Sequence, residues 1–316
     1  MIGKPGRILV TGALGQIGSE LTEELRKRYG RDNVVASDIK ENSRLDGPWT
    51  ILDVTDAQAV EETIAEKKVD SVFHMAAILS ATGEKNPQLC WRVNINGTLN
   101  ILEAARKHGL AKIIIPSSIA AFGPETPKEN TPQETILRPR TMYGVTKVSG
   151  ELICDYYAMK FDLDIRGLRY PGIISSETLP GGGTTDYAVD IYYKAVEDGS
   201  YTCFVKEDTM LPMMYMPDCI KATLDLADAD RRNLVHHSDF NVAALSVTAG
   251  DIAASIRKHI PDFEVEYKPD YRQEIADTWP RSIDDSAARN EWGWKAQWDL
   301  DSMTADMLSK LRKKLL

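Results

Sequence analysis

The sequence predicts an α/β protein: a doubly wound parallel sheet of the Rossmann type, with a smaller C-terminal lobe. Short apolar runs alternate with helical patterns through the first half of the chain, which is typical of parallel strands covered by helices on both faces. A glycine-rich turn joins the first apolar run to the first helical segment. After Gly172 this alternation gives way to shorter elements, which indicates a second lobe.

Strands and helices are predicted in strict alternation from the N-terminus. Apolar runs predict strands at residues 7–10, 34–38, 50–53, 71–75, 112–116 and 164–169, and apolar residues three to four apart predict helices at 16–29, 56–68, 87–108 and 139–161. We expect Asp56 to cap its helix and Gly109 to end the long one. Right-handed crossovers then place a ligand crevice at the carboxyl ends of the strands.

The second half is predicted to begin with a flexible loop, Pro180–Gly183. A helix at 186–197, a strand at 201–205 and a methionine-rich packing segment at 210–216 are expected to follow. We assign residues 1–174 to the Rossmann domain and residues 175–316 mainly to the smaller lobe, with segments near 215–250 returning to the first domain.

Composition excludes several classes of protein. The 316 residues include 38 Lys and Arg against 47 Asp and Glu, an acidic balance that argues against a dedicated nucleic-acid binder. No apolar run approaches the ~20 residues that span a bilayer, so no membrane association is expected. Met1 to Arg7 leave no room for a signal peptide. The cysteines lie far apart without a CxxC pattern, which indicates reduced thiols in a cytoplasmic protein and no metal site.

The glycine-rich turn predicts a dinucleotide site. Glycines stand at Gly12, Gly15 and Gly18, with Leu14, Gln16 and Ile17 among them. Glycine lets backbone N–H groups and a helix N-terminus approach a pyrophosphate. Asp38 ends the second strand, where a carboxylate accepts hydrogen bonds from ribose hydroxyls and repels a 2′-phosphate, so the expected cofactor is NAD. A plain structural turn is the alternative for either feature taken alone.

Two further strand ends fit the same ligand. Asp53 and Val54 would flank the adenine, and the segment Met75, Ala76, Ala77 supplies small residues where a cofactor must pass close to the backbone. Ordinary packing at the sheet edge is the alternative for both. The neighbouring His74 is expected to be a satisfied core histidine.

A proton-transfer site is predicted from three side chains. Tyr143 and Lys147 are four residues apart on one helix and share a face, and Ser118 follows the fifth strand. An ammonium beside a phenol lowers the pKa of the tyrosine, which can then take a hydroxyl proton while hydride leaves the same carbon. Ser118 would hold the substrate oxygen. A surface Tyr–Lys pair is the alternative.

Together these motifs resemble the extended branch of the short-chain dehydrogenase/reductase superfamily, over essentially the whole chain. The resemblance implies that Lys147 also binds the nicotinamide ribose. It implies too that the Tyr170–Ile173 segment, through Tyr170 and Ile173, lies beside the nicotinamide.

Within that branch the chain is similar to the NAD-dependent L-threonine 3-dehydrogenases. Leu179–Ala188 and Thr278–Asp285 carry this similarity, and Ser118–Gly123 and Leu79–Ala81 agree with it. The resemblance implies oxidation of the C3 hydroxyl of L-threonine to 2-amino-3-oxobutyrate, with Tyr143 as base. It implies substrate contacts from Ser80, Ser118, Tyr143, Gly183, Thr184, Thr185, Asp186 and Trp279.

Several alternatives stay open. Asp186 would bind the substrate ammonium, hold the loop closed or cap a helix, and Trp279 would equally serve as core. The family resemblance implies a homodimer through the long helices near 90–108 and 143–160.

The rival functions are a UDP-sugar 4-epimerase or related sugar-nucleotide enzyme, and a non-catalytic NAD-binding regulator. A dehydratase usually has an Asp-Glu pair after the serine, where this chain has Ile119 and Ala120, and residues 175–215 offer a sugar diphosphate only Lys194 and Lys206.

Overall fold

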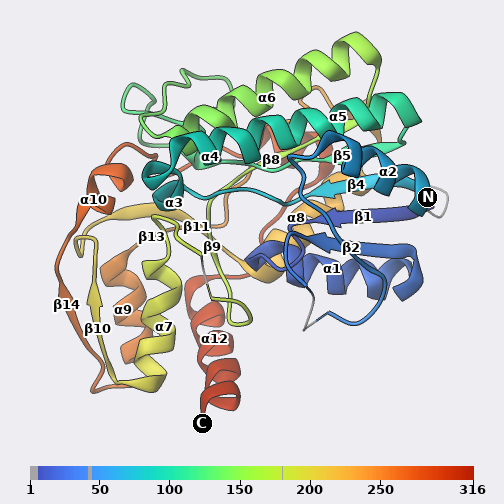
Figure 1. Cartoon of the computed structure of the whole chain (residues 1–316). Helices are drawn as coiled ribbons and strands as arrows, with labels where there is room; N and C mark the ends of the chain where they lie inside the picture. The colour runs from blue at the N-terminus through green and yellow to red at the C-terminus, as the bar shows by residue number, and fades with distance from the viewer. Residues whose placement is uncertain (1–5, 42–44, 180) are drawn as a thin grey trace.

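The computed structural model describes residues 6–41, 45–179 and 181–316. The chain forms a larger lobe around β1, β2, β4 and β5 and a smaller lobe that contains α7, α9, α12, β10 and β14 (Figure 1). Pro180 of the expected glycine loop, and Met1 to Pro5 of the expected N-terminal segment, lie outside the described residues.

The helices and strands follow one another throughout the described chain. The strands are β1 Arg7–Thr11, β2 Val34–Asp38, β3 Trp49–Ile51, β4 Val69–His74, β5 Lys112–Ile114, β6 Ser117–Ser118, β7 Ile165–Arg166, β8 Leu168–Tyr170, β9 Gly172–Ile174, β10 Ser200–Cys203, β11 Met210–Tyr215, β12 Phe240–Asn241, β13 Leu245–Thr248 and β14 Glu264–Tyr267. The α-helices are α1 Gln16–Tyr29, α2 Ala57–Lys67, α3 Ser80–Lys85, α4 Pro87–Trp91, α5 Gly97–His108, α6 Met142–Phe161, α7 Tyr187–Glu197, α8 Met216–Asp228, α9 Ala249–Arg257, α10 Tyr271–Ala276, α11 Ser286–Trp292 and α12 Leu300–Leu315.

The larger lobe is built on a six-stranded parallel sheet in the order β3-β2-β1-β4-β5-β7. Helices α1 and α8 cover one face, and α2, α5 and α6 cover the other (Figure 1). The predicted doubly wound Rossmann sheet is confirmed. The strand order reverses between β1 and β4, which is where such sheets bind their ligands.

Local signals set several element ends as predicted. The Asp56 carboxylate accepts hydrogen bonds from the backbone N–H groups of Gln58 and Ala59 and so caps α2. Gly109 adopts φ +65° and ends α5 in the left-handed conformation that glycine favours. These two predictions are confirmed.

Two expected boundaries differ from the structure at the carboxyl edge of the sheet. Strand β3 ends at Ile51 and leaves Asp53 in a turn, where its carboxylate accepts from the Thr55 N–H at 2.9 Å. Helix α6 begins three residues later than expected, because the Thr141 hydroxyl caps it by accepting from the Gly144 N–H at 3.1 Å. At each boundary a short polar side chain accepts a hydrogen bond from a backbone N–H two or three residues later.

The strand expected at 164–169 is broken in two at Gly167. Its N–H donates to the His237 carbonyl at 2.8 Å instead of continuing the ladder of the main sheet. A Cβ at this position would lie 2.5 Å from the Ile115 carbonyl oxygen. The chain therefore leaves the main sheet after β7 and pairs through β8 with β6 and β12.

The helix expected at 87–108 contains a π-helical turn at Arg92–Asn96 between α4 and α5. Asn94 in this turn accepts from the Ile78 N–H at 2.8 Å and donates to the Thr146 hydroxyl at 3.0 Å. The extra residue of the π turn thus links the segment after β4 to α6, an arrangement common near functional sites.

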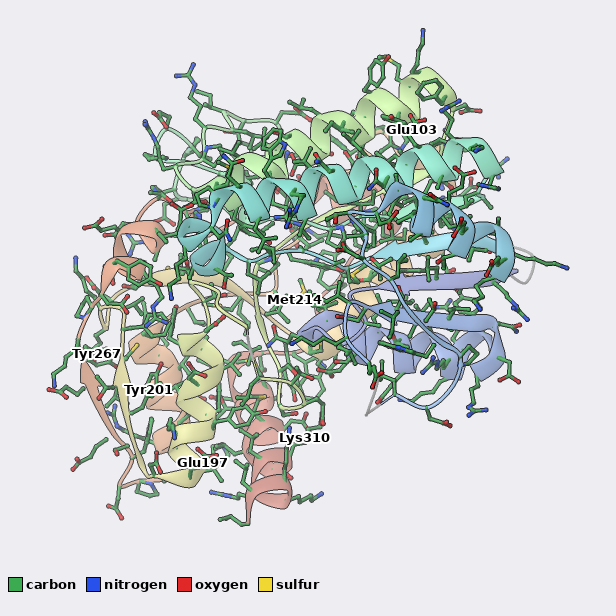
Figure 2. All side chains as sticks on the ribbon, viewed as in Figure 1. Glu103, Glu197, Tyr201, Met214, Tyr267 and Lys310 are labelled. Carbon is green, nitrogen blue, oxygen red and sulfur yellow. The ribbon has the colours of Figure 1, made fainter. Side chains whose placement is uncertain are left out.

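The smaller lobe adds a three-stranded sheet, β13-β11-β9, and a parallel pair, β10 and β14. The methionine-rich segment is strand β11, in which Met213 and Met214 are fully buried, so the expected packing role is confirmed. Met214 lies near the centre of the molecule, whereas Tyr201 and Tyr267 lie on the outer strand pair (Figure 2). The expected strand at 201–205 is β10, which ends at Cys203.

Later segments also contact the larger lobe. Helix α8 packs on α1 and β5, and β12 pairs with β8. The domain boundaries drawn from the sequence remain a prediction.

Two remaining expectations concern membranes and thiols. Among the described helices, none is both long and apolar enough to cross a bilayer. The cysteines Cys90, Cys154, Cys203 and Cys219 are all buried and free of disulfides.

Candidate active site

A cavity of about 210 Å³ opens where the two lobes meet at the carboxyl ends of β1 and β4. It gathers most of the residues predicted from the sequence, from both lobes. Lining it are Gly12, Gly15, Gln16, Ile17, Gly18, Met75, Ala77, Ser80, Ser118, Tyr143, Lys147, Tyr170, Ile173, Gly183, Thr184, Thr185, Asp186 and Trp279.

The glycine turn between β1 and α1 is too tight for side chains. Gly12 has φ +65°, and a Cβ there would lie 2.6 Å from the backbone nitrogen of Ala76. A Cβ at Gly18 would overlap the carbonyl oxygen of Gly12. Glycine is therefore required at both positions, which leaves the backbone open to a ligand at the start of the helix.

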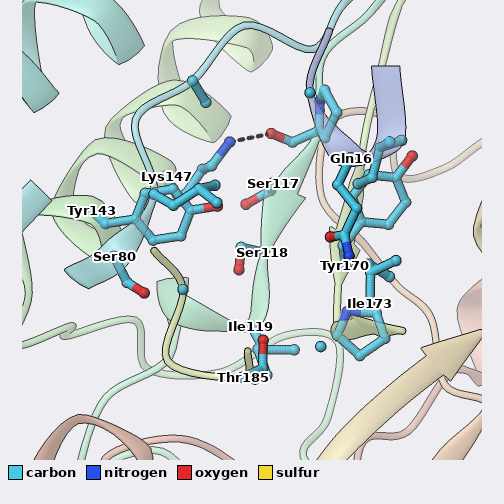
Figure 3. Close-up of a pocket in the computed structure, with 18 of the residues that line it drawn as sticks. Gln16, Ser80, Ser117, Ser118, Ile119, Tyr143, Lys147, Tyr170, Ile173 and Thr185 are labelled. Carbon is cyan, nitrogen blue, oxygen red and sulfur yellow. Dashed lines mark hydrogen bonds between the residues drawn. The ribbon is translucent and has the colours of Figure 1, made fainter. Parts of the chain in front are cut away.

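The residues around this turn fit a dinucleotide. The side-chain nitrogen of Gln16 is buried and has no hydrogen-bond partner in the part of the chain that the structure describes. Gln16 faces the cavity opposite Tyr143 and Lys147 (Figure 3). Asp38 lies next to the turn, where its carboxylate accepts from the Leu14 N–H at 3.1 Å. The glycine turn and the unpartnered donor of Gln16 suit a pyrophosphate. The adjacent carboxylate of Asp38 suits a ribose.

Five predicted cofactor residues do not line the main cavity: Leu14 and Asp38, which lie beside the glycine turn, and Asp53, Val54 and Ala76. Asp53 is held in the turn before α2, and buried Val54 packs against Gly97. Ala76 packs behind the glycine turn and lines a smaller neighbouring cavity. Their proposed contacts with adenine and cofactor remain predictions.

Tyr143, Lys147 and Ser118 come together on one side of the cavity (Figure 3). The first two project from the first turns of α6, and Ser118 ends the short strand β6. The Lys147 ammonium lies 5.4 Å from the centre of the Tyr143 ring and donates to the Pro116 carbonyl at 2.8 Å.

Burial dominates the ionisation of this pair. It raises the pKa of Tyr143 to about 12, against a smaller opposing effect of the Ser118 hydroxyl. It lowers the pKa of Lys147 to about 8, and the charge of Glu151 opposes that shift. The predicted lowering of the Tyr143 pKa by Lys147 is therefore wrong for the protein chain as described: burial raises this pKa, and Lys147 is not among the groups that shift it.

His74 is buried as expected, but only one of its ring nitrogens is satisfied. Its Nδ1 lies 2.8 Å from the Thr11 hydroxyl, whereas Nε2 has no partner among the described residues. Burial lowers the pKa of His74 to about 3, so the ring is neutral. His74 also lines the cavity, which its apolar sequence context did not indicate.

The second glycine loop is held by side chains. The Asp186 carboxylate accepts from the N–H groups of Gly182 at 3.0 Å and Gly183 at 2.8 Å. Burial raises the pKa of this carboxyl to about 6. Asp186 precedes α7 but makes no capping hydrogen bond to it. The helix-cap alternative is therefore wrong, and the side chain instead holds the loop closed.

The loop also docks on α3 across a long sequence separation. The Thr184 N–H donates to the Ser80 hydroxyl at 3.2 Å, and the two hydroxyls lie 3.1 Å apart. The family resemblance implies substrate contacts from Gly183 and Thr184 of this loop. The N–H groups of Gly182, Gly183 and Thr184 have internal partners in this conformation, because Asp186 and Ser80 lie within reach.

Trp279 belongs to the cavity wall and to the core of the smaller lobe. It is 5% exposed and packs in that core. The Lys128 ammonium fixes its backbone by donating to its carbonyl at 3.0 Å. Both interpretations drawn from the sequence, pocket wall and core, describe this side chain.

Some lining residues were not among the predicted site residues. Leu79, Ile119, Pro171 and Gly172 lie in segments that carry the family resemblance, whereas Pro116 and Ser117 were not indicated by the sequence. Most stand next to a predicted site residue. The two-residue strand β6 is too short to produce a periodic pattern that would have indicated them.

Comparisons with known proteins agree with this geometry. The profile of the NAD dependent epimerase/dehydratase family matches residues 8–243. An uncharacterized epimerase/dehydratase of Staphylococcus saprophyticus is 50% identical over 313 residues, covering 98% of each chain. The crystal structure of L-threonine dehydrogenase from Phytophthora infestans has a TM-score of 0.96 at 53% identity, covering 98% of this chain and 100% of that one.

A monomeric L-threonine 3-dehydrogenase from a metagenome has a TM-score of 0.95 at 51% identity and covers 97% of this chain and 99% of its own. The family match spans well over half of the sequence, and the relatives match it almost from end to end. This chain belongs to the NAD-dependent epimerase/dehydratase family.

Proposed function

We propose that this protein is an NAD-dependent L-threonine 3-dehydrogenase, which oxidises the C3 hydroxyl of L-threonine to 2-amino-3-oxobutyrate. One observation carries the proposal. A single cavity is lined by the glycine turn, by Tyr143 and Lys147, and by the Gly183–Asp186 segment of the second lobe. Solved relatives at 51% and 53% identity that bear this activity in their names support it.

The dinucleotide would be held by residues of both lobes. The turn from Gly12 to Gly18 and the free amide of Gln16 suit the pyrophosphate, and Asp38 suits the adenosine ribose. Tyr170 and Ile173 line the part of the cavity opposite Tyr143, where the nicotinamide is proposed to lie (Figure 3). NAD, when bound, accepts a hydride from the substrate carbon.

The chain itself would bind the hydroxyl and move its proton. Ser118 orients the hydroxyl, and the Tyr143 phenolate oxygen takes the proton. Burial alone holds the phenol protonated, so formation of the phenolate needs positive charge nearby. Lys147, one helical turn away, is one source of such a charge, and the positive nicotinamide of bound NAD would be a second.

The lining of the cavity favours a small zwitterion over a sugar nucleotide. Among the described lining residues Lys147 is the only Lys or Arg, and a sugar diphosphate bound beside the NAD pyrophosphate would need further cations. Ile119 and Ala120 are fully buried in the turn after Ser118, so no acidic pair of a dehydratase is present there. Trp279 forms an apolar wall suited to the methyl group of threonine.

We propose that the protein forms a homodimer through α5 and α6. Leu152, Tyr156 and Met159 stand on successive turns of α6 and are 65%, 51% and 81% exposed. An apolar stripe of this kind on a helix surface marks an interface. Sedimentation should give a dimer for the wild type and a monomer for Leu152→Glu. A monomeric wild type, as in the metagenomic relative, would contradict the proposal.

We further propose a cytoplasmic location. The four buried cysteines carry no disulfide, and free thiols persist in reducing compartments. Cell fractionation followed by immunoblotting tests the location.

A substrate panel tests the function. NADH formation should be fast with L-threonine, weaker with L-serine, and weakest with D-threonine or L-allo-threonine, whose inverted centres misplace the ammonium or the hydroxyl. One methyl group in an apolar pocket is worth roughly 1–3 kcal/mol, or about 10–200-fold in kcat/KM. No NADH above the buffer rate with L-threonine, together with interconversion of UDP-glucose and UDP-galactose, would establish the epimerase instead. NAD binding without any turnover would indicate the regulator.

A further inference from the structure

Glu151 lies one helical turn beyond Lys147 on the same face of α6. The two side chains hold consecutive residues of one segment: Lys147 donates to the Pro116 carbonyl at 2.8 Å, and the Glu151 carboxylate accepts from the Ser117 hydroxyl. Ser118 is the next residue along this segment. Figure 3 shows Ser117 and Ser118 one after the other along β6, beside Lys147 and Tyr143.

The same carboxylate binds a buried arginine in a two-pronged arrangement. The Nε and Nη2 atoms of Arg169 donate to the two oxygens of Glu151 at 2.9 and 2.8 Å. Both side chains are almost completely buried. Strands β6 and β8 are in register, so that Ser117 pairs with Arg169 and Ser118 pairs with Tyr170. One carboxylate therefore joins the helix of Tyr143, the strand of Ser118 and the strand of Tyr170.

A second cavity of about 20 Å³ lies between Lys147 and Glu151 and is closed to bulk water by protein on most sides. Charges act strongly across such a poorly solvated space. The titratable and charged groups around Lys147 and Glu151 are Tyr143 and Cys154 on α6, Cys90 on α4, Arg169 on β8, Asp239 before β12 and His74 across the cavity, with Asp155 further along α6.

These neighbours do not all act on Lys147. Asp239 is bound to Arg169 at 3.1 Å, and Asp155 is bound to the Ser238 hydroxyl at 2.7 Å. His74, Cys90 and Cys154 are neutral, because burial lowers the pKa of the histidine and raises the pKa of both thiols. Of the carboxylates, Glu151 is the one that favours the charged form of Lys147 most strongly.

We propose that Glu151 is a positioning residue of this active site, fixing the strand of Ser118 to the helix of Tyr143 and keeping Lys147 as an ammonium. The proposal rests on the dehydrogenase function proposed above. Glu151 touches neither the reacting atoms nor the main cavity. Through its hydrogen bond with Ser117 it fixes the position of Ser118. Through its negative charge it favours the protonated form of Lys147.

Two variants separate the two effects. Glu151→Gln keeps the shape of the side chain and removes its charge, whereas Ser117→Ala keeps the charge and removes the link to β6. Asp155→Asn is the control, because it neutralises an exposed carboxylate one turn further along α6 that is bonded to the Ser238 hydroxyl and not to Ser117 or Arg169. Folding of each variant is checked by circular dichroism and thermal melting.

The ionisation of Lys147 provides a measurement that needs no turnover. Trace labelling with formaldehyde and a borohydride, read by peptide mass spectrometry over a pH series, gives the midpoint at which Lys147 loses its proton. We expect Glu151→Gln to lower this midpoint by about one pH unit or more, since removing an opposite charge close to the ammonium shifts it by ~1–3 units. Ser117→Ala and Asp155→Asn should keep the wild-type midpoint.

Turnover of L-threonine then reports the positional effect. Ser117→Ala should lower kcat ~3–10-fold with an unchanged pH profile, because a slightly misplaced reacting group slows the chemical step. Glu151→Gln should lower kcat ~10-fold or more and move the alkaline limb of the profile to lower pH, with KM for NAD within about threefold of wild type. Asp155→Asn should match wild type.

A wild-type Lys147 midpoint in folded Glu151→Gln overturns the electrostatic part of the proposal. A wild-type kcat in Ser117→Ala overturns the positional part, and this variant decides the question if Glu151→Gln does not fold. A wild type that forms no NADH from L-threonine refutes the proposed function alone, since the labelling midpoints still test Glu151.

Discussion

The protein has two glycine loops at one cavity, and they are held in place differently. In the turn from Gly12 to Gly18 each close approach is between backbone atoms, such as Gly18 against the Gly12 carbonyl. In the loop around Gly182, the contacts come from side chains: Asp186 accepts from two N–H groups, and a Cβ at Gly183 would meet that same carboxylate at 2.6 Å. At Gly181 an added Cβ would meet no atom of the described residues within 4 Å.

This difference separates a fixed site from an adjustable one. Backbone contacts leave the first loop a single shape, which suits a cofactor that every reaction cycle uses. The hydrogen bonds that the loop N–H groups donate to Asp186 and Ser80 can be exchanged for hydrogen bonds to a ligand at little net cost, because one acceptor replaces another. We expect the first loop to tolerate no added atom and the second to tolerate several changes.

Of the substitutions that test this difference between the loops, Gly18→Ala should have the largest effect on NAD binding and on stability. The added methyl group has no space, and the turn must shift by an ångström or more, which is expected to weaken NAD binding ~100-fold or more and to destabilise the fold by about 1–3 kcal/mol. Titration calorimetry with NAD and thermal melting measure the two effects.

Gly181→Ala is the matched change in the other loop. It should leave the affinity for NAD and the turnover of L-threonine within about twofold of wild type, since the methyl group enters open space. Equal losses in Gly18→Ala and Gly181→Ala would remove the distinction between the loops.

The preference for NAD over NADP tests the place of Asp38 beside the fixed loop. With Asp38 at the adenosine ribose, the wild type should prefer NAD to NADP by ~10–100-fold in kcat/KM, because the carboxylate repels a 2′-phosphate and loses its bonds to the ribose. Asp38→Gly should narrow the preference. Steady-state kinetics with both cofactors tests this, and equal wild-type values would place Asp38 away from the ribose.

Asp186→Asn tests the adjustable loop and should change KM for L-threonine by no more than ~10-fold, since the amide oxygen still accepts a hydrogen bond. Steady-state kinetics measures this change.

The pH dependence of the stability of this variant is a second test of the same loop. Burial raises the pKa of Asp186 from 3.8 to about 6, so the folded protein holds this proton more tightly than the unfolded chain does.

The stability that this proton contributes is complete below pH 3.8 and is lost as the pH rises through about 6. Asp186→Asn cannot ionise, so its Tm relative to wild type should rise as the pH increases through about 6. Melting curves of the two proteins at matched pH measure this. A Tm difference that is flat across this range would show that the Asp186 carboxyl is not held as described.

The features that could be predicted from the sequence are those fixed by near neighbours. Helix α1, the Asp56 cap and the glycine stop at Gly109 depend on residues within one or two turns, and periodicity reports such contacts. The six-stranded parallel sheet followed, because continuous apolar strands between helices leave few alternatives.

The features that could not be predicted depend on distant contacts. Gly167 breaks a strand because of His237 and Ile115, and Ser80 meets Thr184 across 104 residues. The ionisation of Tyr143 depends on burial, which no spacing along the chain reveals. The candidate site residues were therefore found by their motifs, whereas the hydrogen bonds that hold them were not.

Turnover of Tyr143→Phe with L-threonine and NAD tests the central claim most directly. The substitution removes only the hydroxyl from a side chain of the cavity wall. If Tyr143 is the base, NAD should bind as in wild type while kcat falls ~10²–10⁴-fold, the usual cost of losing a positioned acid–base group. A kcat within about threefold of wild type would contradict the account and assign proton transfer to another residue.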